Sequence, residues 1–401
     1  MKHRMELKWK FLENDRLFLH SEIEKATEGM IKIIISGGGT GGHVYPAIAI
    51  AEAFKKKVPD AVILFVGAIG KMEMEKVPAA GYPIEGLWIS GFQRRLTWKN
   101  LSFPLKVIHS LWKAAEIIKR FKPDLVIGVG GYASGPMLQT AVREKIPTLI
   151  QEQNSYPGVT NRLLSSKVDR ICVAYTGMDK FFPKDRIVIT GNPVRQDLFK
   201  LDDKREEGLD FFNLRKDRLT VFIMGGSLGA RTINKSILNC IQHGITEKGI
   251  QLLWQTGKFY YEGIKEEQAV VEDQDIHVHQ FIDRMNLAYA AADIIVSRAG
   301  AISISELCLV GKPVILIPSP NVTDDHQTKN ARALEKVNAA ILLNDQEAER
   351  MLFDKIGALQ TDQPKQQMLS ENIRKMAMND AADKIADEAL RMIKSGETEI
   401  K

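Results

Sequence analysis

The fold is decided by two stretches of one pattern, Ile33-Ile34-Ile35-Ser36-Gly37-Gly38-Gly39 and Val221-Phe222-Ile223-Met224-Gly225-Gly226-Ser227. Each is a short apolar run that ends in glycine and continues into a helical pattern. A buried strand, a glycine turn and a helix together form the βα unit of an open parallel sheet. Because this pattern begins twice along the chain, we predict two α/β domains, each Rossmann-like with a doubly wound parallel sheet.

Further strand candidates alternate with helical stretches in both halves of the sequence. They are 62–66, 125–129, 147–150 and 187–190 in the first half, and 251–254, 293–296, 313–317 and 340–343 in the second. Short apolar strands of this kind are typical of parallel sheets that helices cover on both faces.

The domain limits follow from length and from breaks in the pattern. A chain of 401 residues is too long for one ordinary core. Glycine and proline interrupt regular structure at Gly191-Asn192-Pro193-Val194. We predict an N-terminal extension (1–30), a first Rossmann-like domain (31–194), a second (195–375) and a C-terminal helix (376–401) that could pack back on the first domain.

Composition excludes several classes of protein. Hydrophobic residues make up 44% and charged residues 26%, which argues against a disordered or fibrous chain. Cys172, Cys240 and Cys308 lie far apart, which excludes a disulfide framework and a cysteine zinc site and favours a reducing cytoplasm. No apolar run is long enough to span a bilayer, and residues 1–30 lack the apolar centre of a signal peptide.

The first glycine motif is Gly37-Gly38-Gly39-Thr40-Gly41-Gly42-His43. Glycines after a buried strand let a ligand approach the backbone, and their N–H groups favour an anion such as phosphate. The spacing also fits GxGxxG, but the strand that ends Phe65-Val66-Gly67-Ala68 lacks the acid that holds a ribose in dinucleotide folds. This argues against NAD.

His43 follows these glycines near the start of a predicted helix. The helix dipole disfavours an imidazolium there and keeps the ring neutral. A neutral imidazole could accept a proton from a substrate hydroxyl as a general base. Alternatively, His43 hydrogen-bonds a ligand phosphate or the backbone, and the residues alone leave both roles open.

Two motifs in the second half also follow predicted strands and open helices. The segment 225–231 offers glycines and Ser227 to a phosphate, although a purely structural turn is a fair alternative. The segment 297–306 has small residues that leave room for a ligand. Its Glu306 could bind both hydroxyls of a ribose or could only complement the helix dipole, and we favour the ribose.

A fourth motif, residues 318–327, follows the strand 313–317 at the carboxyl end, where open α/β sheets bind ligands. Asp324 and Asp325 could suggest a metal, but acids at helix starts are commoner and no other acid pattern supports a metal site. His326 and Gln327 could contact a ligand or face solvent.

Residues 86–122 interleave aromatic residues with lysine and arginine, which suits an anionic membrane surface. The candidate membrane contacts are Trp88, Phe92, Arg94, Arg95 and Trp98. A solvated amphipathic helix with its aromatic residues in the core is the alternative. Nucleic-acid binding is disfavoured by a net charge of only +5.

Six stretches occur in one order along the chain: 38–43, 130–136, 152–154, 191–195, 225–230 and 301–306. Together they resemble the MurG family of bacterial peptidoglycan glycosyltransferases, from about Ile31 to the end of the chain. The resemblance implies a GT-B fold, with two Rossmann-like domains facing across a cleft. It also implies transfer of N-acetylglucosamine from UDP-N-acetylglucosamine to lipid I, which gives lipid II.

The resemblance further implies where the donor binds, mainly on the second domain. The implied contacts are the main chain of Ile282 for uracil, Glu306 for ribose, Ser227, Arg195 and Ala301-Ile302-Ser303 for the pyrophosphate or nucleotide, and Gln327 with His326 for the sugar. From the first domain, Thr40, Gly41, Gly42 and Asn154 would close over donor and acceptor.

The implied chemistry is one inverting displacement without a metal or cofactor. The C4 hydroxyl of the muramyl sugar attacks the anomeric carbon, His43 resembles the general base, and helix N-termini with Ser227 and Arg195 stabilise the departing UDP. The enzyme would lie peripherally on the cytoplasmic face of the cell membrane, with its basic aromatic segment on the anionic surface.

Two positions depart from the family pattern. Gln151 stands where some relatives carry His, so any role of that His does not transfer to this chain. His326 stands where other relatives have Gln. The alternatives are a GT-B transferase with another acceptor, a nicotinamide oxidoreductase, and a catalytically silent membrane scaffold.

Overall fold

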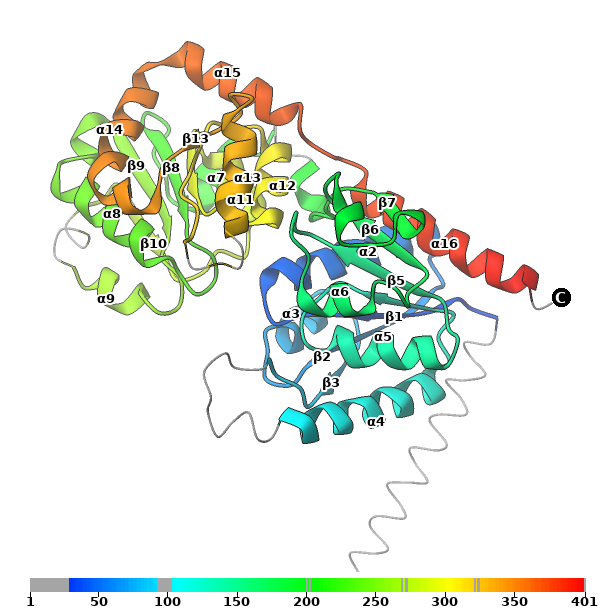
Figure 1. The fold of residues 1–401 in the computed structure, drawn as a ribbon. Coiled ribbons are helices and arrows are strands. Elements are labelled where there is room, and N and C mark those ends of the chain that lie inside the picture. Colours follow the sequence, from blue (N-terminus) through cyan, green and yellow to red (C-terminus); the bar gives the residue numbers. More distant parts are fainter. Residues whose placement is uncertain are drawn as a thin grey trace, which may run out of the picture.

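Two separate parallel sheets, one in each half of the chain, organise the molecule (Figure 1). The computed structural model describes residues 29–91, 103–199, 201, 203–267, 270, 273–320, 322 and 325–399. Helices cover both faces of each sheet. The predicted fold class, two doubly wound α/β domains, is confirmed.

The first sheet contains seven described strands in the order β3-β2-β1-β4-β5-β6-β7, all parallel. Their bounds are β1 Lys32–Ser36, β2 Val62–Ala68, β3 Ile84–Leu87, β4 Leu125–Gly128, β5 Thr148–Glu152, β6 Arg170–Val173 and β7 Ile187–Ile189. The sequence analysis missed β3, which contains Glu85 and Gly86, residue types depleted in strands, and the short β6. The order reverses between β1 and β4, which creates a switch point.

The second sheet contains six described strands in the order β10-β9-β8-β11-β12-β13, again all parallel. Their bounds are β8 Leu219–Met224, β9 Ile250–Gln255, β10 Ile276–His279, β11 Ile294–Ser297, β12 Val314–Leu316 and β13 Ile341–Leu342. The sequence analysis missed the edge strand β10, in which His alternates with Ile and Val. The switch point of this second sheet lies between β8 and β11.

Helices connect the strands and enclose the sheets. Their bounds are α2 Gly41–Lys57, α3 Glu73–Ala79, α4 Phe103–Phe121, α5 Ser134–Arg143, α6 Val159–Leu164, α7 Arg205–Phe211, α8 Arg231–Gln242, α9 Tyr261–Lys265, α11 Met285–Ala291, α12 Ala301–Val310, α13 His326–Glu335, α14 Ala348–Thr361, α15 Gln363–Arg374 and α16 Ala381–Glu399. No described helix combines the length and the apolar character that a membrane crossing needs.

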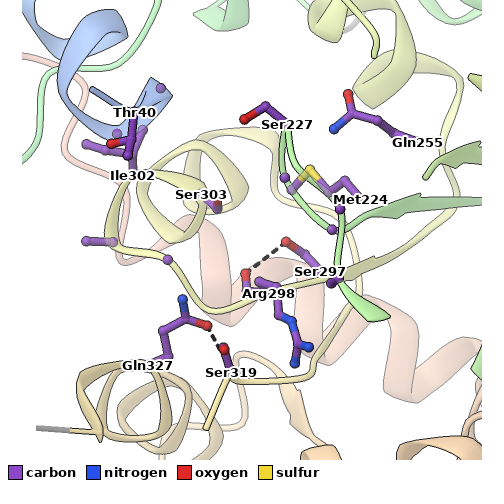
Figure 2. A pocket seen from close by; sticks show the side chains of 18 of the residues that line it. Thr40, Met224, Ser227, Gln255, Ser297, Arg298, Ile302, Ser303, Ser319 and Gln327 are labelled. Carbon is purple, nitrogen blue, oxygen red and sulfur yellow. Dashed lines mark hydrogen bonds between the residues drawn. The ribbon is translucent and has the colours of Figure 1, made fainter. Parts of the chain in front are cut away.

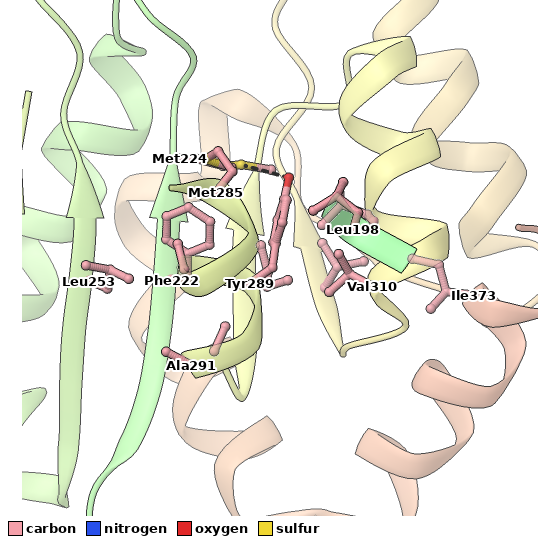
Figure 3. Packing of buried hydrophobic residues seen from close by; sticks show 14 of the residues in the cluster. Leu198, Phe222, Met224, Leu253, Met285, Tyr289, Ala291, Val310 and Ile373 are labelled. Atoms are coloured by element: carbon pink, nitrogen blue, oxygen red, sulfur yellow. Dashed lines mark hydrogen bonds between the residues drawn. The ribbon is translucent and has the colours of Figure 1, made fainter. Parts of the chain in front are cut away.

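The apolar runs of the strands are explained by burial on both faces. In β1, Ile33 and Ile35 pack against α2 and α16, whereas Ile34 points to the other face, toward α4 and α5. Successive side chains of a strand alternate between faces, so a strand covered on both sides must be apolar throughout. The same holds for β8, where Phe222 packs among residues of α11, α12 and α15 (Figure 3) while Val221 faces α8 and α14.

The last helix, α16, returns to the first domain (Figure 1). Its Ala386 and Ala389 are fully buried in the core that α2 and β1 share. In addition, Arg170 Nε of β6 donates to Glu388 Oε1 at 3.0 Å. We propose the boundary between the domains at residues 194 and 195, because β7 ends at Ile189 and β8 begins at Leu219.

Candidate functional site

A cavity of about 1000 Å³ lies between the two domains. Its lining comes from the segments after β1, β2, β5 and β7 of the first sheet and after all six described strands of the second sheet, β8 to β13. All of these segments follow the carboxyl ends of parallel strands, and β1 and β8 each flank a switch point. The two sheets therefore direct their ligand-binding edges into one shared cleft.

The cavity brings together the catalytic and substrate-binding candidates named from the sequence. Its lining includes Thr40, Gly41, Gly42, His43, Asn154, Arg195, Ser227, Ile282, Ala301, Ile302, Ser303, Glu306, His326 and Gln327. Contact of each residue with a substrate stays a prediction. Of the membrane candidates, Trp88 is 46% exposed, whereas Phe92, Arg94, Arg95 and Trp98 lie outside the described residues.

Among the helices that begin at the cavity are α2, α8 and α12. Their N-cap residues are Thr40, Ala230 and Gly300, and none of these three described residues caps its helix with a side-chain hydrogen bond. The first backbone N–H groups of a helix have no partner within the helix, and they carry the positive end of its dipole. The cleft therefore offers converging sites for a polyanion.

The glycines after β8 form a turn that presents Ser227 to the cavity (Figure 2). Gly226 has φ +86° and Gly229 has φ +92°, values that favour glycine. A Cβ on Gly229 would lie 2.3 Å from the Thr256 carbonyl oxygen. The turn therefore needs these glycines for its own geometry, which is the structural interpretation given for residues 225–231. The same turn also lines the cleft.

Glu306 is the centre of a buried ionic group. Its Oε1 accepts from Arg195 Nε at 3.2 Å, and its Oε2 accepts from the Tyr289 hydroxyl at 3.0 Å. Burial and the Glu306 carboxylate raise the pKa of Tyr289 well above its usual value, so the hydroxyl stays a donor. The guanidinium carbon of Arg195 also lies 4.3 Å from the ring centroid of Tyr45, which links the second domain to α2 of the first.

His43 is held in one tautomer by Gln153. Gln153 Nε2 donates to the Val129 carbonyl at 2.8 Å, so its Oε1 is the atom that faces His43 Nδ1 at 3.1 Å. An amide oxygen only accepts, so Nδ1 carries the proton and Nε2 keeps its lone pair. Burial lowers the pKa of His43, although the Glu152 carboxylate partly opposes this. The ring is a neutral base at pH 7.

Asn154 is positioned by Glu152, a carboxylate that is 1% exposed. Glu152 Oε1 accepts from the backbone N–H and the side-chain amide of Asn154 at 2.9 and 3.1 Å. Its Oε2 accepts from Gly158 N at 3.1 Å and Asn161 Nδ2 at 2.8 Å. Four hydrogen bonds satisfy the buried charge and fix the loop after β5 at the cleft.

Two candidate contacts already use part of their hydrogen-bonding capacity. The Ile282 N–H donates to Gln255 Oε1 at 2.9 Å, which leaves the carbonyl of Ile282 for a ligand. Gln327 Oε1 accepts from Ser319 N at 2.8 Å, which leaves the Nε2 of Gln327 as the group that can donate to a sugar (Figure 2).

Asp325, the acidic residue directly before α13, contacts the first turn of that helix. Asp325 Oδ1 accepts from Thr328 Oγ1 at 2.6 Å, whereas Asp324 lies outside the described residues. Among the residues that the structure describes, no group of three or more His, Cys, Asp and Glu side chains could hold a metal ion.

The sequence analysis assigned no role to several polar residues of the cleft. Gln255 and Ser319 follow predicted strands, so the rule that located the other candidates could have found them. Arg298 was quoted within a motif without a role. It donates to the carbonyl oxygens of Ile317 and Pro318 at 2.9 and 3.1 Å and pairs with Asp345, so it fixes the turn after β11.

Comparisons with known proteins agree with this geometry. Residues 33–173 match the glycosyltransferase family 28 N-terminal domain, and residues 220–385 match the glycosyltransferase family 28 C-terminal domain. A relative from Cytophaga hutchinsonii is 57% identical over 362 residues, 90% of this chain and 97% of its own. One from Bacteroides thetaiotaomicron is 54% identical over 366 residues, 91% of this chain and 98% of its own. Both are named UDP-N-acetylglucosamine--N-acetylmuramyl-(pentapeptide) pyrophosphoryl-undecaprenol N-acetylglucosamine transferase.

Solved structures lead to the same family. The crystal structure of Acinetobacter baumannii MurG is 26% identical with a TM-score of 0.68, and the match covers 90% of this chain and 99% of that one. A UDP-GlcNAc 2-epimerase from Neisseria meningitidis, 13% identical with a TM-score of 0.65 over 90% of this chain and 100% of that one, shares the fold alone. The resemblance inferred from the motifs is confirmed: this chain belongs to glycosyltransferase family 28, among the MurG enzymes.

Proposed function

We propose that this chain transfers N-acetylglucosamine from UDP-N-acetylglucosamine to the C4 hydroxyl of the muramyl sugar of lipid I, forming lipid II. One observation carries the proposal: relatives named for this transfer align with nearly the whole chain, and nearly the whole of each relative is covered. The cleft has the dimensions and the polar character that a nucleotide sugar and a second sugar require.

The donor binds mainly to the second domain. The open N-termini of α8 and α12 and the hydroxyl of Ser227 offer donors to the pyrophosphate, and Arg195 adds a fixed positive charge. The ribose lies against Glu306 and the uracil against the main chain of Ile282. His326 and Gln327, at the start of α13, contact the sugar.

Transfer is a single displacement with inversion. The acceptor C4 oxygen forms a bond to the anomeric carbon, and the bond from that carbon to the phosphate oxygen breaks. UDP leaves with the bonding electron pair, and His43 Nε2 takes the hydroxyl proton. The groups around the pyrophosphate stabilise the charge that develops on the leaving group.

The activity is tested with the purified full chain, labelled UDP-N-acetylglucosamine and a lipid I analogue. We expect a labelled disaccharide-lipid product in which the new bond has the opposite anomeric configuration to the donor. A diacylglycerol acceptor in a parallel reaction is expected to give none. Donor hydrolysis without transfer, or transfer only to the diacylglycerol, would contradict the proposed acceptor.

A membrane surface is the second partner that we propose, and α4 supplies the contact. Leu105, Ile108 and Trp112 are 64%, 65% and 64% exposed and lie on one face of the helix. Trp88 lies beside them, with Lys106 Nζ 5.7 Å from its ring centroid. Exposed apolar side chains interleaved with lysines suit the anionic face of a bilayer, where the enzyme would lie peripherally and meet a lipid-borne acceptor.

Replacing Ile108 and Trp112 with glutamate is expected to lower binding to phosphatidylglycerol vesicles by at least about tenfold, because two large apolar side chains no longer leave water on binding. Co-sedimentation measures the bound fraction. Val337→Glu, at a site that is 50% exposed in the second domain, is the matched control. Equal sedimentation of the double variant and the unmodified protein would refute the assignment of this surface.

A further inference from the structure

Glu73, the first residue of α3, is a buried carboxylate that the proposed reaction does not use. Its side chain is 1% exposed. Its Oε2 accepts from Gly39 N at 2.8 Å, and its Oε1 accepts from Ala68 N at 2.9 Å. The carboxylate thus joins the loop after β1 to the end of the neighbouring strand β2, through two charge-assisted hydrogen bonds.

Two glycines make room for this carboxylate. A Cβ on Gly38, which has φ +145°, would lie 2.2 Å from Glu73 Cδ, and a Cβ on Gly67 would lie 2.5 Å from Glu73 Cγ. No side chain can be added at either position without moving Glu73. The glycine-rich sequence after β1 is therefore built around an internal anion.

The backbone of the glycine loop divides into two halves. The N–H groups of Gly37, Gly38 and Gly39 donate to the Val66 carbonyl at 3.2 Å, the Gly130 carbonyl at 3.3 Å and Glu73. A phosphate bound at Gly37 to Gly39 would lie against the Glu73 carboxylate, and the three backbone N–H groups that could bind it already donate to other acceptors. The second half, Thr40 to Gly42, opens α2 and lines the cleft.

We propose that Glu73 is a positioning residue: it fixes the glycine loop so that Thr40 and His43, at the start of α2, are held in the geometry that transfer requires. This inference rests on the proposed function. It also replaces the interpretation of the first glycine motif as a phosphate cradle for residues 37–39, because the anion there belongs to the chain.

Glu73→Gln is the informative variant because it keeps the volume of the side chain but removes one of its two acceptor oxygens. Only one of the two backbone N–H groups can then keep its acceptor. We expect kcat for transfer to fall about ten- to a hundredfold, as small misplacements of reacting groups do. UDP-N-acetylglucosamine affinity should stay within about twofold, because the donor binds mainly to the other domain. Glu75→Gln, on the exposed side of the same helix, is the matched control.

The pH profile separates positioning from simple destabilisation. The charged groups that act on His43 are Glu152 of β5 and Glu73 of α3, and both raise its pKa. In Glu73→Gln the acid limb of kcat should therefore move to lower pH, whereas a loss of folded protein would leave the limb in place. A variant with kcat within about twofold of the unmodified protein, or with an unmoved limb, would overturn the proposal.

One measurement does not depend on turnover. In spectra of the full chain, Glu73→Gln should shift the amide resonances of Gly39 and Ala68 and also the ring signals of His43. Glu75→Gln should leave all three in place. Unchanged His43 ring signals in Glu73→Gln would overturn the proposal. If these signals respond but the unmodified protein transfers no sugar, the proposed function has failed and the role of Glu73 in holding His43 has not.

Discussion

Replacing His43 with alanine is expected to lower kcat for N-acetylglucosamine transfer by about 100- to 10,000-fold, the usual contribution of a general base. Gln153 holds the ring through Nδ1, so the lone pair of Nε2 is the only basic position left to the imidazole. Alanine removes that base without disturbing the donor contacts of the second domain. Affinity for UDP-N-acetylglucosamine should therefore stay within about twofold.

The pH dependence of the unmodified enzyme follows from the same geometry. Burial lowers the pKa of His43 below its ordinary value of 6.5. The active form is the neutral ring, so kcat should hold steady from pH 8 through 6.5 and fall only when the pH passes the lowered pKa. His43→Ala should lose this acid limb, because the imidazole ring whose protonation causes it is gone.

Single-turnover kinetics and calorimetric donor binding, both from pH 5 to 8, measure these two effects. His243→Ala is the matched control, since His243 is exposed on the second domain and does not line the cleft. If His43→Ala kept full turnover with an unchanged acid limb, His43 would be a binding residue and the base would lie elsewhere.

The sheets could be predicted because their central strands are covered on both faces. Such strands must be apolar at every position, and β1 and β8 stand out from their surroundings for that reason. The strands that escaped prediction are two edge strands, β3 and β10, and the short inner strand β6, whereas the edge strands β7 and β13 were predicted. At the edge, β3 and β10 carry polar residues or glycine, and their pairing with β2 and β9 depends on neighbours distant in sequence.

The cleft was predictable as far as it is local. Glycine turns and helix starts after strands are contiguous in sequence, and the candidates that these patterns supplied, among them His43, Ser227 and Glu306, line the cavity. Asn154, Arg195 and Ile282, which the resemblance to the family supplied, line it as well. The partners of these residues were not predictable. His43 meets Gln153 across 110 positions, Arg195 meets Glu306 across 111, and Gly39 meets Glu73 across 34. Only the topology brings these pairs together, and no local pattern encodes them.

Replacing Glu306 with alanine is expected to affect folding and donor binding together. The side chains of Glu306 and Arg195 are only 7% and 19% exposed, and alanine leaves the guanidinium and the Tyr289 hydroxyl without their acceptor. Breaking a buried ion pair from one side costs about 3–5 kcal/mol, and the partial exposure of Arg195 favours the lower end. Urea unfolding measures this loss, and calorimetry should show donor affinity lowered at least about tenfold, because the proposed ligand of the ribose is gone.

A second variant distinguishes the structural contribution from the binding contribution. In Arg195→Met/Glu306→Leu the two charges are removed together, and packed apolar side chains can replace a buried ion pair at little cost. Stability should therefore recover most of its loss, whereas donor affinity should stay low because neither of the two proposed donor contacts, Arg195 and Glu306, returns. Asp217→Ala, which breaks an exposed pair with Arg215, should change neither quantity measurably. If the double variant regained donor affinity along with stability, Glu306 would serve the fold alone and the ribose would need another ligand.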